Sequence, residues 1–532
     1  MRRLADRGGR RTWRGGRAWG WAVLAAAVAL SWGWPTRTEG RIATVRILAT
    51  TDMHGNVRPV PGRYLEHNDG GMLKVAAEVK RLRAENPETL LVDSGDVFQG
   101  TAESLLTGAR PVIRIFNALG YDAWALGNHE FDWGTVELAR ILSEVEPVPL
   151  AANLSRAGAR GAFGKIRDWT VAECDGVRVG IAGLTNPNLN QWFGELAGEG
   201  LHAYASDRAL ERVLGDLNEE GVQVKVLLLH QGLKAQDDAA NEVNAIGRWF
   251  GEFDLALGGH LHFLVPQGLR VGQIDYAQAG SGARGVLEVQ LDYDTVERRV
   301  TAKRYAWHSV TGADAPEDPE LAAAVADDLA AAERELAKKV GRAAEDIPAS
   351  HAVPGESPMQ QLLCRAIAEE TGADVVLHGL FSLEGLAAGD VTEEDVWRIV
   401  PYENRVMTAW LTPEDLRAIL VEDLEFWGKE RYFGTWGLEF EVHPKEEAGR
   451  RVRALRGAGG RVLHGRQRIL VAFGSYHASG GGGRFPELER RVHDPRARLK
   501  DSGVRLRDCV MRYFRKHRSV KVEAGKGVRV VK

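Results

Sequence analysis

The sequence predicts an α/β protein of 532 residues with two domains, and three observations lead to this prediction. Short apolar segments that end in polar residues and glycine recur along the first half of the chain, with helical patterns between several of them. A central stretch rich in Ala, Glu, Leu and Lys has apolar residues at helical spacing. The region after it has its own mixture of helical and strand patterns and is long enough for a second core. Strands that alternate with helices are typical of layered α/β folds.

The apolar segments of the first region are the expected buried strands, because each is short and bounded by turn-forming residues. Two helical patterns lie between them, at Gly71–Glu85 and Val136–Glu144. In open α/β folds, functional groups gather where strands end. The expected strands are Val45–Thr50, Thr89–Val92, Ala123–Leu126, Val148–Ala151, Val177–Ala182, Val224–Leu229 and Leu255–Leu257.

A long helix is expected in the central stretch, where Asp318 is a suitable cap and Pro319 suits the first helical position. The pattern is equally compatible with a helix that bridges two domains and with one that packs on the first domain. The expected organisation is an export segment at 1–40, a first domain at 41–315, a linker helix at 316–345 and a second domain at 346–532.

The composition excludes several classes of protein. Lys plus Arg is 69 and Asp plus Glu is 73, so the net charge of −4 gives no basic signature for a nucleic-acid polymer. Cys174, Cys364 and Cys509 allow at most one internal disulfide, and no pair of them has metal-ligand spacing. We expect a monomer whose partner is a small molecule.

The first 40 residues read as an export signal. An Arg-rich start is followed by the apolar stretch Ala18–Trp34, and Pro35 ends it. The stretch is shorter than the roughly 20 residues that a membrane-spanning helix needs, although an uncleaved anchor is the alternative. The pair Arg10-Arg11 resembles a twin-arginine signal. We therefore expect a periplasmic or extracellular protein with no stable membrane insertion beyond this segment.

Five polar motifs follow expected strands, and together they predict a metal site. Each motif alone would more often be a turn, a helix cap or a structural histidine. Carboxylate oxygens and imidazole nitrogens suit Zn, Mn, Fe or, at the harder end, Mg and Ca. They also fit a pair of divalent ions about 3.5–4 Å apart with one bridging carboxylate. The motifs are Asp52-Met-His54, Asp93-Ser-Gly-Asp96, Gly127-Asn128-His129-Glu130-Phe131-Asp132, His230-Gln-Gly and Gly258-Gly-His260-Leu-His262.

In this order, the motifs resemble those of the calcineurin-like metallophosphoesterases. More narrowly, the chain resembles the 5′-nucleotidase family, which includes exported bacterial UDP-sugar hydrolases and 2′,3′-cyclic-nucleotide phosphodiesterases. The resemblance covers nearly the whole chain after the export segment. It implies an N-terminal four-layer α/β/β/α metallophosphoesterase domain, a long linker helix and a C-terminal α/β domain of the 5′-nucleotidase type that recognises the substrate.

The resemblance also implies two divalent metal ions (Mn, Zn, Fe, Co, Mg or Ca) and a role for each motif residue. The first ion would be held by Asp52, His54 and His262, and Asp93 would bridge both ions. The second ion would be completed by Asn128, His230 and His260. His129 would form a catalytic dyad with Asp132.

Physical chemistry supports these roles. A phosphoester transition state needs its oxygens neutralised and a hydroxide in line with the leaving oxygen, which two metal ions supply. A cationic His129 would stabilise charge and protonate the leaving alkoxide. A carboxylate such as that of Asp132 would orient the imidazole and favour its charged form.

In the second domain, the resemblance places a nucleoside pocket at three residues. Tyr402 and Tyr476 match aromatic rings that stack on a base, and Asn404 matches an asparagine that contacts it. Stacking on such a ring contributes about 1–3 kcal/mol per base.

Three other positions depart from the family pattern. Leu383 and Gly355 stand where arginines are expected, and Gly482 stands where an aspartate holds the ribose hydroxyls. Loss of these groups would weaken the polar recognition of a nucleotide. Compensation would have to come from Arg398, Arg405, Arg431 or Arg484.

The sequence therefore predicts an exported dinuclear-metal phosphoesterase that hydrolyses phosphoesters, nucleotides among them, with a metal-activated hydroxide and a His-Asp dyad. One alternative keeps the metals and changes the substrate to a non-nucleotide phosphoester, a cyclic or diester compound, or a thiosulfate-type ester. The other is a ligand-binding protein with vestigial catalysis. Intact His129 and Asp132 argue against the second alternative.

Overall fold

The structure is a computed structural model. It describes residues 40–59, 69–156, 161–193, 196, 200–429, 432–481 and 485–531. The expected export segment, apart from Gly40, lies outside the described residues. Among the described residues, no helix has both the length and the apolar character needed to cross a membrane.

The N-terminal domain contains two six-stranded sheets. Their strand orders are β14-β13-β1-β2-β3-β4 and β11-β12-β10-β9-β7-β6. The strands of the first sheet are β1 (Ile42–Thr50), β2 (Leu90–Asp93), β3 (Ala123–Ala125), β4 (Val148–Leu150), β13 (Gly285–Asp294) and β14 (Arg299–Ser309). Those of the second are β6 (Trp169–Cys174), β7 (Val177–Leu184), β9 (Val224–Leu229), β10 (Leu255–Gly258), β11 (Leu264–Val271) and β12 (Ile274–Ala279). All seven expected strands are present.

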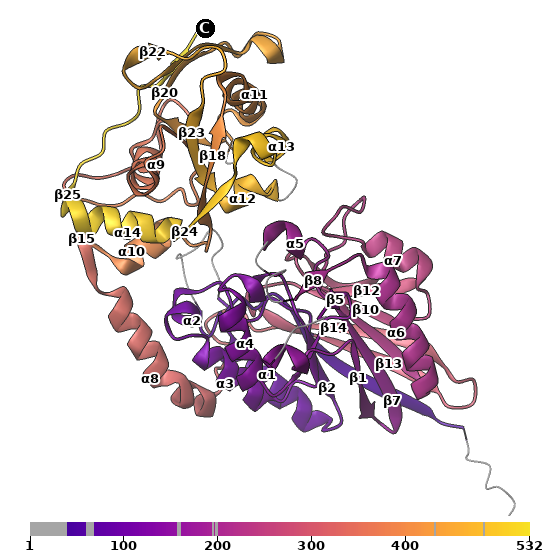
Figure 1. Ribbon diagram of the computed structural model, residues 1–532. Coiled ribbons are helices and arrows are strands. Elements are labelled where there is room, and N and C mark those ends of the chain that lie inside the picture. Colours follow the sequence, from indigo (N-terminus) through magenta and orange to yellow (C-terminus); the bar gives the residue numbers. More distant parts are fainter. Residues whose placement is uncertain are drawn as a thin grey trace, which may run out of the picture. The chain divides into compact units, whose positions relative to one another are not determined.

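Helices cover both outer faces of this pair of sheets. On one side are α1 (Met72–Glu85), α2 (Ala102–Leu106), α3 (Arg110–Leu119) and α4 (Thr135–Glu144), and on the other are α6 (Ser206–Glu220) and α7 (Val243–Trp249) (Figure 1). A third apolar core, with Val45 and Val226 among its members, fills the space between the sheets. The expected four-layer α/β/β/α domain is therefore confirmed. Smaller elements are β5 (Leu154–Ser155), β8 (His202–Ala203) and α5 (Leu189–Trp192).

The central helix α8 (Pro319–Leu336) starts as expected but ends sooner. The side chain of Asp318 accepts a hydrogen bond from the Leu321 amide, which caps the helix. Leu321 and Val325 belong to the core of the N-terminal domain, so the helix packs on that domain as well as leading to the next.

The predicted linker helix at 316–345 is too long, because Lys339–Ala343 form a strand, β15. This strand pairs with β17 (Gly389–Thr392) and β25 (Ser519–Val520). A Cβ at Gly341 would lie 2.9 Å from the carbonyl oxygen of Phe514, so the close approach of the two backbones requires glycine there.

The C-terminal domain is built around the five-stranded sheet β19-β16-β23-β18-β24. Its strands are β16 (Val375–His378), β18 (Arg405–Leu411), β19 (Gly434–Trp436), β23 (Ile469–Gly474) and β24 (Lys500–Arg505). Separate apolar cores lie on its two sides, one with α9 (Pro358–Thr371) and α14 (Leu506–His517), the other with α11 (Pro413–Asp423) and α13 (Pro486–Val492). Further elements are α10 (Glu393–Ile399), α12 (Ser475–Ala478) and the sheet of β20 (Leu438–Val442), β21 (Val452–Gly457), β22 (Arg461–Val462) and β26 (Val528–Val530).

The three cysteines do not pair: Cys174 lies in the core between the two N-terminal sheets, and Cys364 and Cys509 lie in one core of the C-terminal domain. Cys174, Cys364 and Cys509 are all free and buried. The fold of the described residues therefore contains no disulfide.

Candidate metal centre

Parallel pairing brings the polar motifs to one edge of the N-terminal domain. Strands β1, β2 and β3 run parallel in one sheet, and β9 runs parallel to β10 in the other. Because parallel strands end on the same side of a sheet, the residues after them meet there. Asp52 and His54 follow β1, Asp96 follows β2, His230 follows β9, and the Gly-His-Leu-His motif follows β10.

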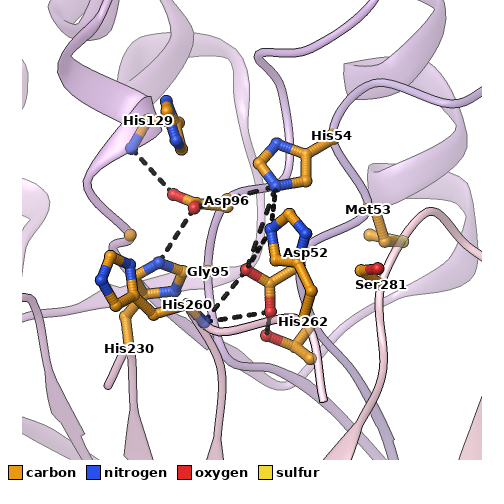
Figure 2. Close-up of polar contacts among 12 residues, drawn as sticks. Asp52, Met53, His54, Gly95, Asp96, His129, His230, His260, His262 and Ser281 are labelled. Atoms are coloured by element: carbon orange, nitrogen blue, oxygen red, sulfur yellow. Dashed lines mark hydrogen bonds and ion pairs between the residues drawn. The ribbon is translucent and has the colours of Figure 1, made fainter. Parts of the chain in front are cut away.

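The first donor group consists of Asp52, His54 and His262. The Nε2 atoms of His54 and His262 are 2.9 Å apart, and the Asp52 carboxylate oxygen Oδ1 lies 3.6 Å from His262 Nε2 and 4.0 Å from His54 Nε2. Figure 2 shows these three side chains converging, with Asp52 below the two rings. Burial and the adjacent His262 lower the pKa of His54 to about 3, which keeps that imidazole neutral and able to donate a lone pair.

The second donor group consists of Asp52, Asp96 and His230, all fully buried. The Oδ2 atom of Asp96 lies 2.9 Å from Nε2 of His230. Neither atom makes a hydrogen bond of acceptable geometry with any described residue. Buried polar atoms of this kind are almost always satisfied in proteins, so the pair fits a bound cation.

Asp93, the residue expected to bridge the two ions, is not part of either group, whereas Asp96, the second acid of the same motif, belongs to the second group. Asp93 is the last residue of β2, and its carboxylate accepts hydrogen bonds from the Thr50 hydroxyl at 2.6 Å and the Gly95 amide at 2.7 Å. The chain leaves the sheet after Asp93 and turns at Gly95, where φ is 100°. The acid that reaches the sheet edge is therefore the second one of the motif.

The cluster residues share an uncommon backbone conformation. Positive φ angles between 49° and 70° occur at five of them, and such angles are rare outside glycine. This local strain aims the side chains of successive motif residues into the cluster instead of away from it. The five residues are Asp52, His54, Asp96, His260 and His262.

Backbone carbonyls fix which nitrogen of each buried imidazole faces the centre. The Nδ1 atom of His54 lies 2.9 Å from the carbonyl oxygen of Gln99, and Nδ1 of His230 lies 2.7 Å from that of Ser94. Because a carbonyl only accepts, each Nδ1 carries a proton, and Nε2 is the nitrogen that faces the centre. A histidine that binds a metal through one ring nitrogen typically donates the N–H of the other to a carbonyl or carboxylate.

Glu130 supports the cluster from behind, a role that the sequence analysis did not assign. Its carboxylate accepts hydrogen bonds from the amides of Asp96, Val97 and Gly127, at 2.9, 2.7 and 2.6 Å. It thereby holds the turn that presents Asp96. The sequence offered one signal for this role: Glu130 is the only polar residue of the Gly127–Asp132 motif to which no role was assigned.

Asn128 and His260 lie together beside the second group. The side-chain oxygen of Asn128 is 2.9 Å from Nδ1 of His260, whose backbone amide donates to the Asp52 carboxylate at 3.0 Å. The indole ring of Trp192 stacks on the His260 ring, with centroids 5.9 Å apart.

The expected dyad has the predicted geometry. Nδ1 of His129 lies 2.8 Å from a carboxylate oxygen of Asp132, and the backbone amide of His129 donates to Asp96 at 2.8 Å. Burial alone would lower the pKa of His129, but the charges of Asp132 and Asp96 raise it to about 10. The ring is therefore a cation at neutral pH, and 36% of the side chain is exposed.

In the C-terminal domain, the predicted aromatic residues are presented at the surface. The side chains of Tyr402 and Tyr476 are 43% and 37% exposed. A further ring, that of the half-buried Phe381, packs edge-to-face against Tyr402 with centroids 5.4 Å apart. No motif in the sequence pointed to Phe381.

The arginines proposed as compensating groups are engaged elsewhere or lie outside the described residues. Arg398 donates to Glu384 and Asp395 at 2.9 Å, and Arg405 lies 3.0 Å from Asp501. Arg431, Arg484 and Gly482 are not among the described residues. Leu383 is 71% exposed. A Cβ at Gly355 would lie 2.7 Å from Cα of Gly434. The backbone carbonyl of Asn404 accepts a hydrogen bond from the Leu506 amide.

Comparison with known families accounts for both domains. Residues 45–264 match the calcineurin-like phosphoesterase family, and residues 339–490 match the 5′-nucleotidase C-terminal domain family. The first domain is therefore of the calcineurin-like phosphoesterase type and the second is of the 5′-nucleotidase C-terminal type. The donor groups lie within the residues that match the first of the two families.

Individual relatives agree with this assignment. The trifunctional nucleotide phosphoesterase protein YfkN of Bacillus subtilis is 24% identical over 90% of this chain and 38% of its own length. The chain spans less than half the length of the curated relatives that it matches. Among solved structures, the 5′-nucleotidase precursor of Thermus thermophilus has a TM-score of 0.69 at 22% identity and covers 92% of this chain and 99% of its own. A Staphylococcus aureus structure in complex with alpha-ketoglutarate has a TM-score of 0.79 at 19% identity over 92% and 100% of the two chains.

Proposed function

We propose that this chain is a phosphoesterase that hydrolyses nucleotides at a centre of two divalent cations. The observation that carries the proposal is the pair of donor groups that share Asp52. Asp96 takes the bridging place in this proposal, and Asn128 and His260 complete the second position. Carboxylates with neutral imidazoles suit several divalent ions, so the donor set does not select one of them. Two such ions, when bound, supply a hydroxide at neutral pH and neutralise phosphoryl charge.

His129 and Asp132 would protonate the leaving group. With Nδ1 of His129 held by Asp132, its Nε2–H is left to face a substrate, and the raised pKa keeps the proton there. This group would donate the proton to the departing alkoxide oxygen. The hydrogen bond from the His129 amide to Asp96 links the position of the acid to the position of the donor cluster.

Nucleotides are the proposed substrates because two kinds of observation support them. Relatives with that activity in their names match 90% and 47% of the chain. The exposed rings of Tyr402 and Tyr476 offer faces on which a base can stack. The export of the protein beyond the cytoplasmic membrane is a further proposal and rests on residues 1–40 of the sequence alone.

A matched pair of substitutions tests the proposed centre. Asp96→Asn and Asp93→Asn make the same change of side chain in the same motif, three residues apart. After removal of metals and reloading with Mn²⁺, we expect wild type and Asp93→Asn to bind about two ions per chain. We expect Asp96→Asn to lose metal and more than about 100-fold in turnover. Elemental analysis and turnover of AMP, a 2′,3′-cyclic nucleotide, a UDP-sugar and nitrophenyl phosphate measure these effects.

Two outcomes would contradict the proposal. Loss of metal by Asp93→Asn with retention by Asp96→Asn would mean that the bridging residue is the other acid. A metal-loaded wild type that turns over no phosphoester would favour a ligand-binding protein.

A further inference from the structure

One buried guanidinium holds the loop that presents Tyr402. Arg507 lies more than a hundred residues later in the chain, at the start of α14. Its Nε donates to the carbonyl oxygen of Val400 at 2.9 Å, and one terminal nitrogen donates to the Glu403 carboxylate at 2.8 Å. The other terminal nitrogen donates to the carbonyl oxygen of Tyr402 at 3.3 Å. The guanidinium of Arg507 thus binds three acceptors within the four residues 400–403.

The two residues before Arg507 also contact this loop. The amide of Leu506 donates to the carbonyl oxygen of Asn404 at 2.9 Å, and Nε of Arg505 lies 3.2 Å from the second carboxylate oxygen of Glu403. The guanidinium of Arg507 also lies over the ring of Trp397, 3.1 Å from its centroid. Cation–π contacts at desolvated sites are strong enough to restrain the guanidinium plane.

Arg507 and Glu403, which hold the loop, are buried, whereas Tyr402, which the loop presents, is exposed. Arg507 is 2% exposed and the Glu403 side chain is 4% exposed, whereas Tyr402 is 43% exposed. The loop therefore has a fixed backbone and presents a partly exposed aromatic ring. A ring held in its bound position before the ligand arrives avoids the ordering cost of binding.

We propose that Arg507 is a positioning residue for substrate recognition, because it holds the Tyr402–Asn404 loop ready to stack on a flat leaving group. The inference rests on the proposed function of this chain as a phosphoesterase. It names the substrate class that the loop serves: phosphoesters of an aromatic or heteroaromatic alcohol or nucleoside. Small aliphatic phosphoesters would reach the metal centre without using the loop.

Arg507→Lys tests the inference, because Lys keeps the charge but cannot place donors at three separated acceptors. Arg46→Lys is the matched control, since Arg46 forms an equally buried pair with Glu288 at 2.7 Å in the other domain. For Arg507→Lys we expect the KM for AMP and nitrophenyl phosphate to rise about tenfold relative to that for glycerol phosphate. The kcat for AMP and the content of metal should stay within about twofold of wild type, and Arg46→Lys should leave the ratio of KM values unchanged.

A double-mutant cycle with Tyr402→Ala keeps the test valid if stability also falls. If Arg507 acts through Tyr402, the double variant should show no larger KM ratio than Tyr402→Ala alone. Additive effects, an equal KM rise for glycerol phosphate, or the same change in Arg46→Lys would each overturn the inference.

Hydrogen exchange distinguishes failure of the inference from failure of the proposed function. Arg507→Lys should speed amide exchange within residues 400–404, and Arg46→Lys should not. If wild type turns over no phosphoester, the proposed function fails, and unchanged exchange in Arg507→Lys would independently refute the anchoring role.

Discussion

The metal centre and the Tyr402 loop position their functional side chains in opposite ways. In the metal centre, each donor stands one to four residues after a strand, and the left-handed backbone at five of these positions aims the side chain. In the loop, the backbone is held by Arg507, a residue that is close only in the folded chain. The first arrangement depends on short motifs, and the second depends on tertiary packing. Substitutions in the metal centre should therefore cause large losses of turnover or metal affinity, whereas substitutions around the loop should cause smaller changes in KM.

The largest effect should come from His129→Ala, which tests whether the dyad serves chemistry and not assembly of the donor cluster. We expect unchanged metal content and a loss of about 10²–10⁴-fold in turnover of AMP, whose alkoxide leaving group needs a proton. Nitrophenyl phosphate should lose less, because nitrophenolate leaves without one. Elemental analysis and steady-state kinetics on both substrates measure this. Equal losses would show that His129 stabilises the phosphoryl group instead of protonating the leaving group.

The next effect should come from Glu130→Gln, which weakens the support behind Asp96. A glutamine has one accepting oxygen, and its amino group would face a backbone donor, so the three amide bonds cannot all be kept. We expect metal affinity to fall by about 10–100-fold, as for other residues that orient ligands. Titration of metal-free protein with Mn²⁺ measures the affinity. Glu137→Gln, at a half-buried position of α4, is the control, and equal affinity in both variants would refute the supporting role.

A smaller effect is expected for Tyr476→Ala, which probes the recognition surface without touching its anchor. Loss of one stacking face should raise the KM for AMP by about tenfold and leave the KM for glycerol phosphate nearly unchanged. Tyr513→Ala removes a half-buried ring from α14 in the same domain and serves as the control. A KM rise for both substrates would mean that Tyr476 supports the fold instead of contacting substrate.

The smallest effect on turnover should come from Glu288→Gln, which separates stability from chemistry. Burial opposes ionisation of Glu288, but its hydrogen bonds with Arg46, Gln290 and His308 lower its pKa from 4.5 to about 2. Stability from a lowered pKa is present above about pH 4.5 and is lost as pH falls through about 2. We therefore expect the variant to melt at a lower temperature than wild type at pH 6, with a smaller difference at pH 3. Exposed Glu297→Gln is the control, and a difference that grows as the pH falls would contradict the prediction.

Local patterns in the sequence predicted most of the N-terminal domain and part of its site. The apolar runs gave every expected strand, and the residues after them gave Asp52, His54, His230 and His262 as members of the donor groups. The error at Asp93 had a local cause. Asp93 directly follows the apolar run that predicts the strand, and only the structure shows that the strand extends to include it.

Residues that act through the folded chain could not be predicted in this way. The three amides held by Glu130 come from two separate segments, and Phe381 meets Tyr402 only when β16 and β18 join the same sheet. Arg507 had no motif around it, because its acceptors are backbone carbonyls that carry no sequence signature. The end of α8 was misplaced for a similar reason, since the strand after it forms only by pairing with distant segments.

The left-handed backbone of the donor residues also restricts how the centre can evolve. Only glycine, asparagine, aspartate and histidine occupy that conformation readily, and aspartate and histidine already stand at all five positions. Exchanges among Asp, Asn and His can therefore alter the charge and softness of the ligand set at little conformational cost. Longer or branched residues such as Glu or Thr would add backbone strain before any metal is bound. A change of metal preference in this lineage should thus follow a narrow path of Asp, Asn and His substitutions.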